Sequence, residues 1–91
     1  MHPLEKARNL GPVSAAELES IGIRTLAQMR QYGWEEVCVR WAEAFPARIN
    51  LNAFISVIGA IDDVDWRRVD PELRRRAQSL ARRLKAAARP V

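Results

Sequence analysis

Cysteine and histidine are nearly absent from this chain of 91 residues, which contains one of each, Cys38 and His2. A lone cysteine excludes an intrachain disulfide and is typical of a reducing compartment such as the cytoplasm. The two residues do not stand at metal-ligand spacing, so we expect no metal ion and no cofactor, and we interpret His2 as a surface residue. Cys38 lies on the apolar side of a predicted helix, which favours a buried, inert thiol over a nucleophile.

Long apolar runs are also absent. No stretch approaches the roughly 18 to 20 apolar residues that a membrane span needs, and the first residues lack the apolar core of a signal peptide. We therefore expect a soluble cytoplasmic protein without a membrane partner. The chain is 48% hydrophobic and 29% charged, with only four glycines and five prolines, which predicts one globular domain over residues 1–91 rather than disorder.

Recognisable catalytic groups are missing as well. The chain offers no nucleophile with a base and no phosphate-binding glycine loop, so we predict no enzymatic activity, no catalytic residue and no small-molecule substrate. A chain of this length buries about 60 to 65% of its unfolded surface, which leaves little room for a deep pocket. Asp62, Asp63 and Asp65 lack the further ligands and the glycine of a calcium loop, and we interpret them as a polar turn after a helix.

The spacing of apolar residues is helical along the whole chain, and no alternating pattern indicates a strand. A first helix is predicted around residues 3–9, closed by Gly11 in a left-handed conformation. A second begins at Ser14, where the hydroxyl and the carboxylate of Glu17 are spaced as a capping box. It ends at Gly22, which has no Cβ to oppose a left-handed turn.

Four further helix starts and stops are visible. Thr25 and Gln28 repeat the capping box, Pro46 ends the following helix, Asn50 caps a very apolar helix, and Asp70 precedes a proline that opens the last one. The helix after Asn50 has little polar surface, so we expect it in the middle of the core. These signals together predict an all-α bundle of five to six helices. The inward stripe of the last helix is Leu73, Ala77, Leu80, Ala81 and Leu84.

Asn9 to Thr25 contain two glycine turns spaced eleven residues apart, each leading into a capped helix, which is a helix-hairpin-helix signature. The start of a helix carries unpaired N–H groups and partial positive charge, and can therefore bind a phosphate. Alternatively, the turns only organise helix packing, because Pro12 lacks an N–H and Val13 disfavours a positive φ. The candidate nucleic-acid contacts in this stretch are Asn9, Gly11, Ser14, Gly22, Arg24 and Thr25.

Positive charge is concentrated in the last helix. Seven basic residues and one acid lie between Glu72 and Arg89, whereas the remainder of the chain has eight basic and ten acidic residues. These basic positions fall away from the apolar stripe and form either an ordinary solvated face or a phosphate-binding face. The candidate nucleic-acid contacts here are Arg75, Arg82 and Arg83.

Several of these motifs together resemble a known family. They are the run Asn9-Leu-Gly-Pro-Val-Ser-Ala, the run Ile21-Gly-Ile-Arg-Thr25, Asn50-Leu51, Gly59-Ala60, Trp66 and Pro71-Glu-Leu73. Over nearly the whole chain this set resembles the C-terminal domain of the TfoX (Sxy) family of competence regulators. Its first part also resembles the helix-hairpin-helix region in the C-terminal domain of the RNA polymerase alpha chain. The resemblance implies an all-helical, non-enzymatic domain linked to activation of genes for DNA uptake.

Two functional hypotheses follow. In the first, the domain is a DNA- or transcription-linked regulator whose partner is DNA or a protein of the transcription machinery. In the second, it is a protein-protein interaction module with no direct DNA binding and with an exposed apolar surface near Trp34 or Val69. We interpret Trp34, Trp41 and Trp66 as packing anchors. Many family members carry a further N-terminal domain, and we expect any activity that needs it to be missing from this chain.

Overall fold

The computed structural model describes Leu4 and residues 7–88, and these residues form a bundle of helices without a strand. The all-α prediction is therefore confirmed. Two short 3-10 turns, η2 and η3, interrupt the later connections. The elements in chain order are α1 (Pro12–Ser20), α2 (Leu26–Tyr32), α3 (Trp34–Ala44), η2 (Pro46–Arg48), α4 (Leu51–Asp62), η3 (Trp66–Arg68) and α5 (Pro71–Ala88).

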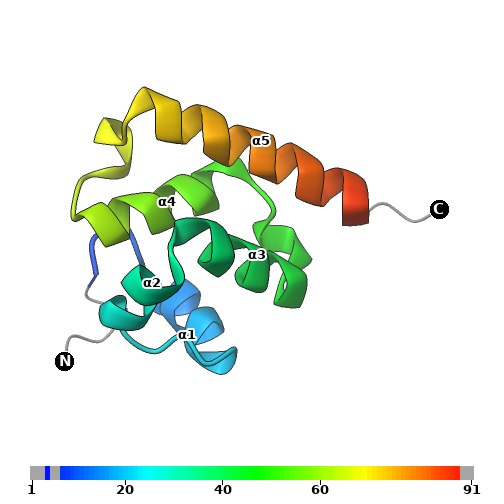
Figure 1. Cartoon of the computed structure of the whole chain (residues 1–91). Helices are drawn as coiled ribbons and strands as arrows, with labels where there is room; N and C mark the ends of the chain where they lie inside the picture. The colour runs from blue at the N-terminus through cyan, green and yellow to red at the C-terminus, as the bar shows by residue number, and fades with distance from the viewer. Residues whose placement is uncertain (1–3, 5–6, 89–91) are drawn as a thin grey trace.

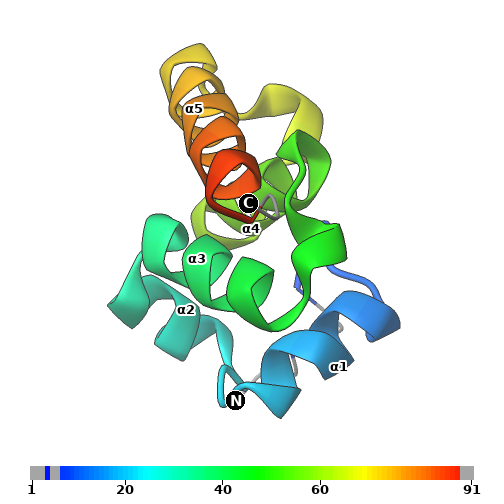
Figure 2. The same ribbon diagram turned by 90° about the vertical axis from the view of Figure 1, so that its right-hand side faces the viewer.

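Helix α4 lies in the middle of the bundle, with α5 along one side and α1 and α2 on the other (Figures 1 and 2). It packs against α2, α3 and α5, and α3 also contacts α5. Phe54 and Val57 of α4 are fully buried, and Ile55 and Ile58 are 1% exposed, as the prediction of a central apolar helix required. Asn50 caps this helix as predicted, because its Oδ1 accepts the N–H of Ala53 at 2.8 Å.

Three other helix ends follow the sequence signals. The Thr25 hydroxyl accepts the N–H of Gln28 at 3.1 Å and the Gln28 side chain accepts the N–H of Thr25 at 3.2 Å, which completes the predicted capping box. Gly22 closes α1 at φ +90°. Helix α5 begins at Pro71, and Asp70 Oδ1 accepts the N–H of Glu72 at 2.7 Å.

The start of α1 differs from the prediction. Helix α1 begins at Pro12, with Gly11 as its N-cap in an extended conformation, so Ser14 stands inside the first turn and makes no capping hydrogen bond. The predicted capping box at Ser14 is wrong. The reason is Pro12, whose fixed φ suits the first helical position and whose missing N–H is not needed there.

The residues before α1 also depart from the prediction. Asn9, and not Gly11, adopts the positive φ, at +71°. The N–H of Ala7 bonds the carbonyl of Leu4 at 2.9 Å and that of Leu10 bonds Ala7 at 3.2 Å, so the described residues form successive turns where a helix was expected. Part of that predicted helix, and His2, lie outside the described residues. An asparagine tolerates the left-handed region better than most residues, which explains why Asn9 adopts the conformation that was predicted for Gly11.

Asn9 joins the start of the chain to the loop after α4. Its Nδ2 donates to the carbonyl of Val64 at 2.9 Å, and its Oδ1 accepts the N–H of Trp66 at 3.1 Å. Gly59 of α4 makes room for this arrangement, because a Cβ there would overlap Asn9 Nδ2 and lie 2.7 Å from the Val64 carbonyl oxygen. We call these contacts among Asn9, Gly59, Val64 and Trp66 the Asn9 clamp. Asn9, Gly59 and Trp66 all belong to the motifs that carry the family resemblance.

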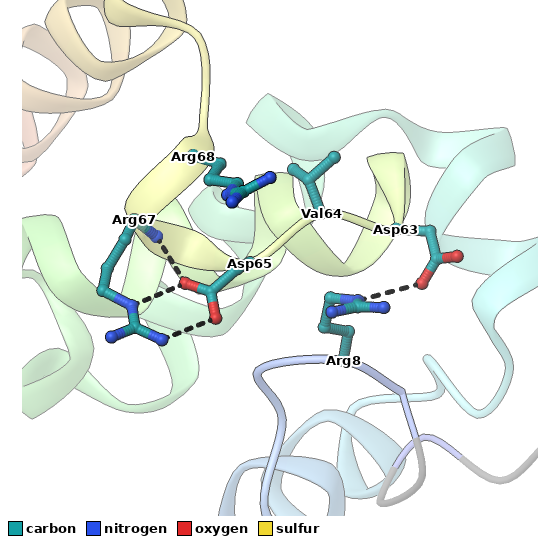
Figure 3. A pocket seen from close by; sticks show the side chains of 6 residues that line it. All are labelled: Arg8, Asp63, Val64, Asp65, Arg67 and Arg68. Carbon is teal, nitrogen blue, oxygen red and sulfur yellow. Dashed lines mark hydrogen bonds and ion pairs between the residues drawn. The ribbon is translucent and has the colours of Figure 1, made fainter.

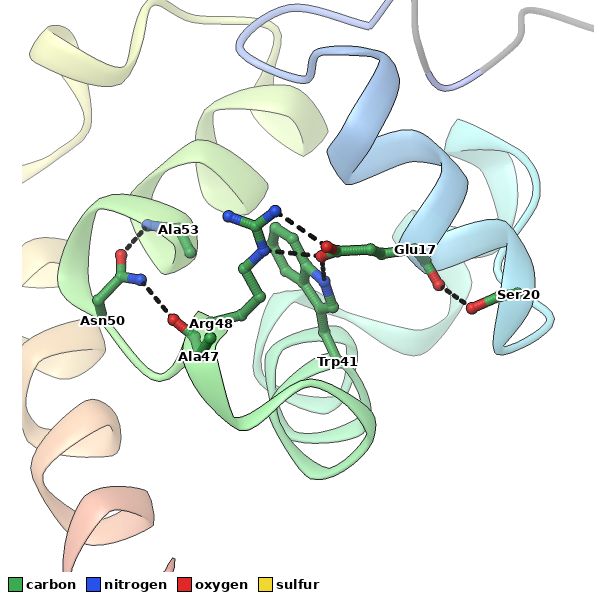
Figure 4. A network of polar contacts seen from close by, with 7 residues as sticks. All are labelled: Glu17, Ser20, Trp41, Ala47, Arg48, Asn50 and Ala53. Carbon is green, nitrogen blue, oxygen red and sulfur yellow. Dashed lines mark hydrogen bonds and ion pairs between the residues drawn. The ribbon is translucent and has the colours of Figure 1, made fainter.

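A second long-range network joins α1, α3 and η2 through Glu17 (Figure 4). Arg48 donates to both carboxylate oxygens of Glu17, at 2.7 and 2.9 Å, and Trp41 Nε1 donates to Oε1 at 2.8 Å. The Arg48 guanidinium also lies over the Trp41 ring, 5.6 Å from its centroid. Glu17, which was predicted to close a capping box, instead holds α1 against the rest of the bundle.

The Glu17 network predicts a loss of stability in acid. Hydrogen bonds from Arg48, then from Trp41, lower the pKa of the Glu17 carboxyl below its usual 4.5. As pH falls below 4.5, Glu17 takes up a proton in the unfolded chain before it does so in the folded one. The stabilisation by the Glu17 carboxylate is therefore fully present above pH 4.5 and is lost as pH drops through the pKa of the folded state. At pH 7 we expect Glu17→Gln to have a lower free energy of unfolding than the unmodified protein. At pH 3 we expect this difference between the two proteins to be smaller. Urea unfolding across that range measures this, and a constant gap would contradict it.

Candidate nucleic-acid interface

The first glycine corner presents free backbone groups. Val13 is 64% exposed, and within the described residues no acceptor bonds the N–H of Val13 or Ser14. Pro12 contributes no N–H, so this helix start offers fewer donors than a glycine-rich turn would. The turn at Gly11 therefore leaves two N–H groups accessible, and these provide only a weak positive potential for an anion.

The second glycine corner is closed by the chain's own atoms. The N–H groups of Gly22 and Ile23 bond the carbonyls of Glu19 and Leu18 at 3.0 Å, in the two-bond pattern that ends many helices. The N–H groups of Arg24 and Thr25 both donate to the Gln28 side chain. The N–H groups from Gly22 to Thr25 are therefore all bonded within the chain, so a phosphate at this corner could meet only those of Leu26 and Ala27 at the start of α2, which have no acceptor among the described residues.

The side chains predicted as contacts near these corners have unequal roles. Both polar groups of Asn9 are used in the Asn9 clamp, and the Thr25 hydroxyl caps α2. Ser14 is partly buried in the first turn of α1. Arg24 is exposed, and its guanidinium makes no ion pair with any residue between 7 and 88. Of the residues predicted at these two corners, Arg24 is thus the one that supplies a free charge.

The basic residues of α5 divide into two groups. In its first half, Arg74 donates to the carbonyls of Val69 and Trp66, Arg75 pairs with Glu72, and Arg76 pairs with Glu35 of α3. In its second half, Arg82, Arg83 and Lys85 are exposed and pair with no acid in the described part of the chain. Arg89 lies outside that part. The uncompensated charge of α5 is therefore at its C-terminal end.

The two groups of predicted contacts do not form one surface. In both views α1 and the Gly22 corner lie on the opposite side of the bundle from α5, with α3 and α4 between them (Figures 1 and 2). A single straight duplex that touched the exposed face of α5 would face away from the glycine corners. The structure thus separates α1 and the turn that follows it from α5.

A hollow of about 610 Å³ was not foreseen from the sequence. It lies between the chain start and the connection from α4 to η3, and six residues line it (Figure 3). Arg67 and Arg68 are adjacent and could have been suspected, but Arg8 is 55 residues from its partner Asp63 and no local pattern brings it there. The lining residues are Arg8, Asp63, Val64, Asp65, Arg67 and Arg68.

Titratable groups give little support to catalysis or metal binding. Cys38 is fully buried, and burial raises the pKa of its thiol, which confirms the prediction of an inert cysteine. Asp65 is held as a carboxylate, because hydrogen bonds from Arg67 lower its pKa. Among the described residues no three histidine, cysteine, aspartate or glutamate side chains are grouped to hold a metal ion. None of the described helices combines the length and apolarity needed to cross a bilayer.

The aromatic predictions are confirmed in part. Trp41 is 1% exposed and packs in the core as expected, and Trp34 is partly buried beneath Arg76, whose guanidinium lies 5.5 Å from its ring centroid. Trp66 is 43% exposed, so its interpretation as a packing anchor is wrong. Val69 is 3% exposed and provides no apolar surface for a partner, contrary to the expectation for an interaction module.

Comparisons with known proteins place the fold. A family model described as the TfoX C-terminal domain matches residues 1–81. A crystal structure of an uncharacterized protein from Listeria monocytogenes, in a triclinic form, superposes with a TM-score of 0.85 over 92% of this chain and 94% of that chain, at 20% sequence identity. At that identity the likeness shows the shared fold alone. No curated protein matches the chain.

Proposed function

This chain belongs to the TfoX C-terminal domain family, and from that membership we propose that it is a non-enzymatic DNA-binding domain of transcription-linked regulation. The role in genes for DNA uptake is the one that the resemblance to competence regulators implies. A non-catalytic role agrees with the buried, protonated state of Cys38 and with the structural use of Glu17 in binding Arg48.

The observation that carries the proposal is the free positive charge on the second half of α5. Arg82, Arg83 and Lys85 project from a helix whose opposite side is buried through Leu80 and Ala81. At 3.6 residues per turn these three cations spread over the exposed half of the helix. The only acid of α5 itself is Glu72, at its other end, which pairs with Arg75. Glu43 of α3 lines a hollow with Leu84 and Ala87 and makes no ion pair with these three cations. Such a surface attracts the phosphate backbone without reading its sequence.

The proposal departs from the hairpin mode of binding. The N–H groups from Gly22 to Thr25 are bonded within the chain, and the Gly11 corner lies on the other side of the bundle from α5. We therefore assign the contact to Arg82, Arg83 and Lys85, with the hairpins serving to pack α1 and α2. Protein-protein interaction without DNA binding is the alternative that the experiment below separates.

Fluorescence anisotropy with a labelled duplex tests the assignment. Two or three phosphate contacts predict binding about 10- to 40-fold weaker at 200 mM than at 50 mM salt. We expect Arg82→Glu with Arg83→Glu to weaken binding at least about tenfold at 50 mM salt, because two attractive contacts become repulsive.

Arg24→Glu is the matched control for the single change Arg83→Glu, because both arginines are exposed and make no ion pair with a described residue. The proposal requires a larger loss from Arg83→Glu. A larger loss from Arg24→Glu would return the contact to the glycine corners. Absence of any binding at 50 mM salt would refute DNA binding and leave the protein-interaction alternative.

A further inference from the structure

The hollow beside η3 collects three guanidinium groups from two distant parts of the chain. Arg67 and Arg68 come from η3, and Arg8 comes from the segment before α1 (Figure 3). Two carboxylates, Asp63 and Asp65, also line it, so the lining carries a net charge of +1. Its volume of about 610 Å³ lies in the range of ordinary small-ligand sites, about 300 to 1,000 Å³.

The carboxylates hold two of the arginines in place without occupying all their donors. Arg8 donates through Nε to Asp63 at 3.2 Å, and the two terminal nitrogens of Arg8 make no further hydrogen bond to a described residue. Arg67 uses Nε and Nη2 on Asp65, at 2.9 and 3.1 Å. Asp63 and Asp65 are therefore each paired with a guanidinium group, and they repel an anion less than unpaired carboxylates would.

Arg68 is the uncompensated member of the group. Its side chain makes no hydrogen bond or ion pair with another described residue, and its guanidinium points from η3 toward the side chain of Val64 (Figure 3). None of its five N–H donors is used by a residue that the structure describes, and they have the planar arrangement that matches a phosphate.

The backbone that carries these arginines is fixed. Asn9 bonds the loop at Val64 and Trp66, and Arg74 of α5 donates to the carbonyls of Trp66 and Val69. Val69, which follows Arg68 directly, is 3% exposed. A site whose supporting residues are already bonded needs little reordering when a ligand binds.

From this geometry we infer that the hollow is a phosphate-binding site, in which Arg68 and the free terminal nitrogens of Arg8 contact the phosphate oxygens. The phosphate belongs either to a small phosphate ester or to a nucleic-acid backbone. The inference does not depend on the role of α5, because none of the residues that line the hollow belongs to that helix.

Nuclear magnetic resonance titration of the whole chain with inorganic phosphate, at constant ionic strength, tests the site. We expect saturable shifts of the Nε–H signals of Arg8 and Arg68. Arg68→Gln should weaken the binding about tenfold or more, because it removes a positive charge and its charge-assisted hydrogen bonds to the phosphate. Arg40→Gln is the control: Arg40 is an exposed arginine of α3 that pairs with Glu36, and its loss should leave the affinity unchanged.

Two further titrations identify the source of the phosphate. If a nucleic-acid phosphate enters the hollow, Arg68→Gln lowers the salt slope of duplex binding by about 0.9. If a small ester is the ligand, that slope is unchanged and adenosine monophosphate binds with the same dependence on Arg68.

The double change Arg82→Glu with Arg83→Glu should leave the phosphate titration unchanged in either case. Failure of the proposal for α5 can therefore be distinguished from failure of the phosphate site. Linear, unsaturable shifts, or equal affinity of Arg68→Gln and the unmodified protein, would overturn the inference.

Discussion

Gly59→Ala is expected to lower the free energy of unfolding by about 1 to 3 kcal/mol, which is the usual effect of adding a methyl group to a filled space. The new Cβ would overlap Asn9 Nδ2 and lie 2.7 Å from the Val64 carbonyl oxygen. The Asn9 side chain can turn away, but only by giving up its bonds to Val64 and Trp66, while the Val64 carbonyl belongs to the backbone. Thermal unfolding followed by circular dichroism should show a midpoint lower by about 5 to 20 °C.

Two companion variants make the Gly59 result specific. Gly11→Ala places a Cβ where no atom lies within 4 Å and where φ is −97°. Only its small helix-capping effect, under about 1 kcal/mol, is expected. Adding Asn9→Ala to Gly59→Ala removes one of the two close contacts, so the pair should be less destabilising than the sum of the single changes. Strict additivity would show that Asn9 and Gly59 do not act together.

Trp41→Ala is expected to lower the free energy of unfolding by about 3 to 5 kcal/mol. Trp41 is 1% exposed in the core, and its Nε1 donates to Glu17 at 2.8 Å. The change therefore removes a large apolar side chain, one hydrogen bond and the ring beneath Arg48. Since small domains are stable by only about 5 to 15 kcal/mol, the variant should unfold at a much lower urea concentration.

Trp41→Phe separates the two parts of this effect. Phenylalanine keeps most of the buried ring but cannot donate to Glu17, so a loss of only about 1 to 2 kcal/mol is expected. Glu17→Gln should then cost less in the Trp41→Phe background than alone, because only the two bonds from Arg48 remain to be lost. A Trp41→Phe variant as unstable as Trp41→Ala would mean that the hydrogen bond, and not the buried ring, dominates.

The helix ends that sequence reasoning located correctly all depend on nearby residues. Thr25 with Gln28, Asn50 with Ala53, and Asp70 with Glu72 bond across two or three positions. A side chain that bonds its own helix start produces a fixed spacing, which can be read directly. The predicted N-cap at Ser14 was wrong because a proline two residues earlier begins the helix sooner.

Contacts between distant residues were not predictable in the same way. Glu17 meets Arg48 across 31 positions, and Asn9 meets Val64 and Trp66 across 55 and 57. Neither residue type indicates its partner, because the partner is set by how the helices pack. The motif residues Asn9, Gly59 and Trp66 were recognised as a set, but their common purpose in the clamp required the structure.

The free charges of the candidate interface were likewise only partly predictable from the sequence. The excess charge of the last helix was visible in the sequence, and Arg82 and Arg83 are exposed as expected. The pairing of Arg76 with Glu35, and the distance of the glycine corners from α5, depend on the arrangement of helices in space. Composition therefore located the charge without showing which arginines are free.

The Asn9 clamp also bears on the order in which the molecule assembles. Closing a loop of more than fifty residues is entropically unfavourable until the intervening helices have packed, so we expect the clamp to form late in folding. Changes at Gly59 should then accelerate unfolding while hardly altering the refolding rate. We therefore expect Gly59 to affect the lifetime of the native molecule more than the rate at which it forms.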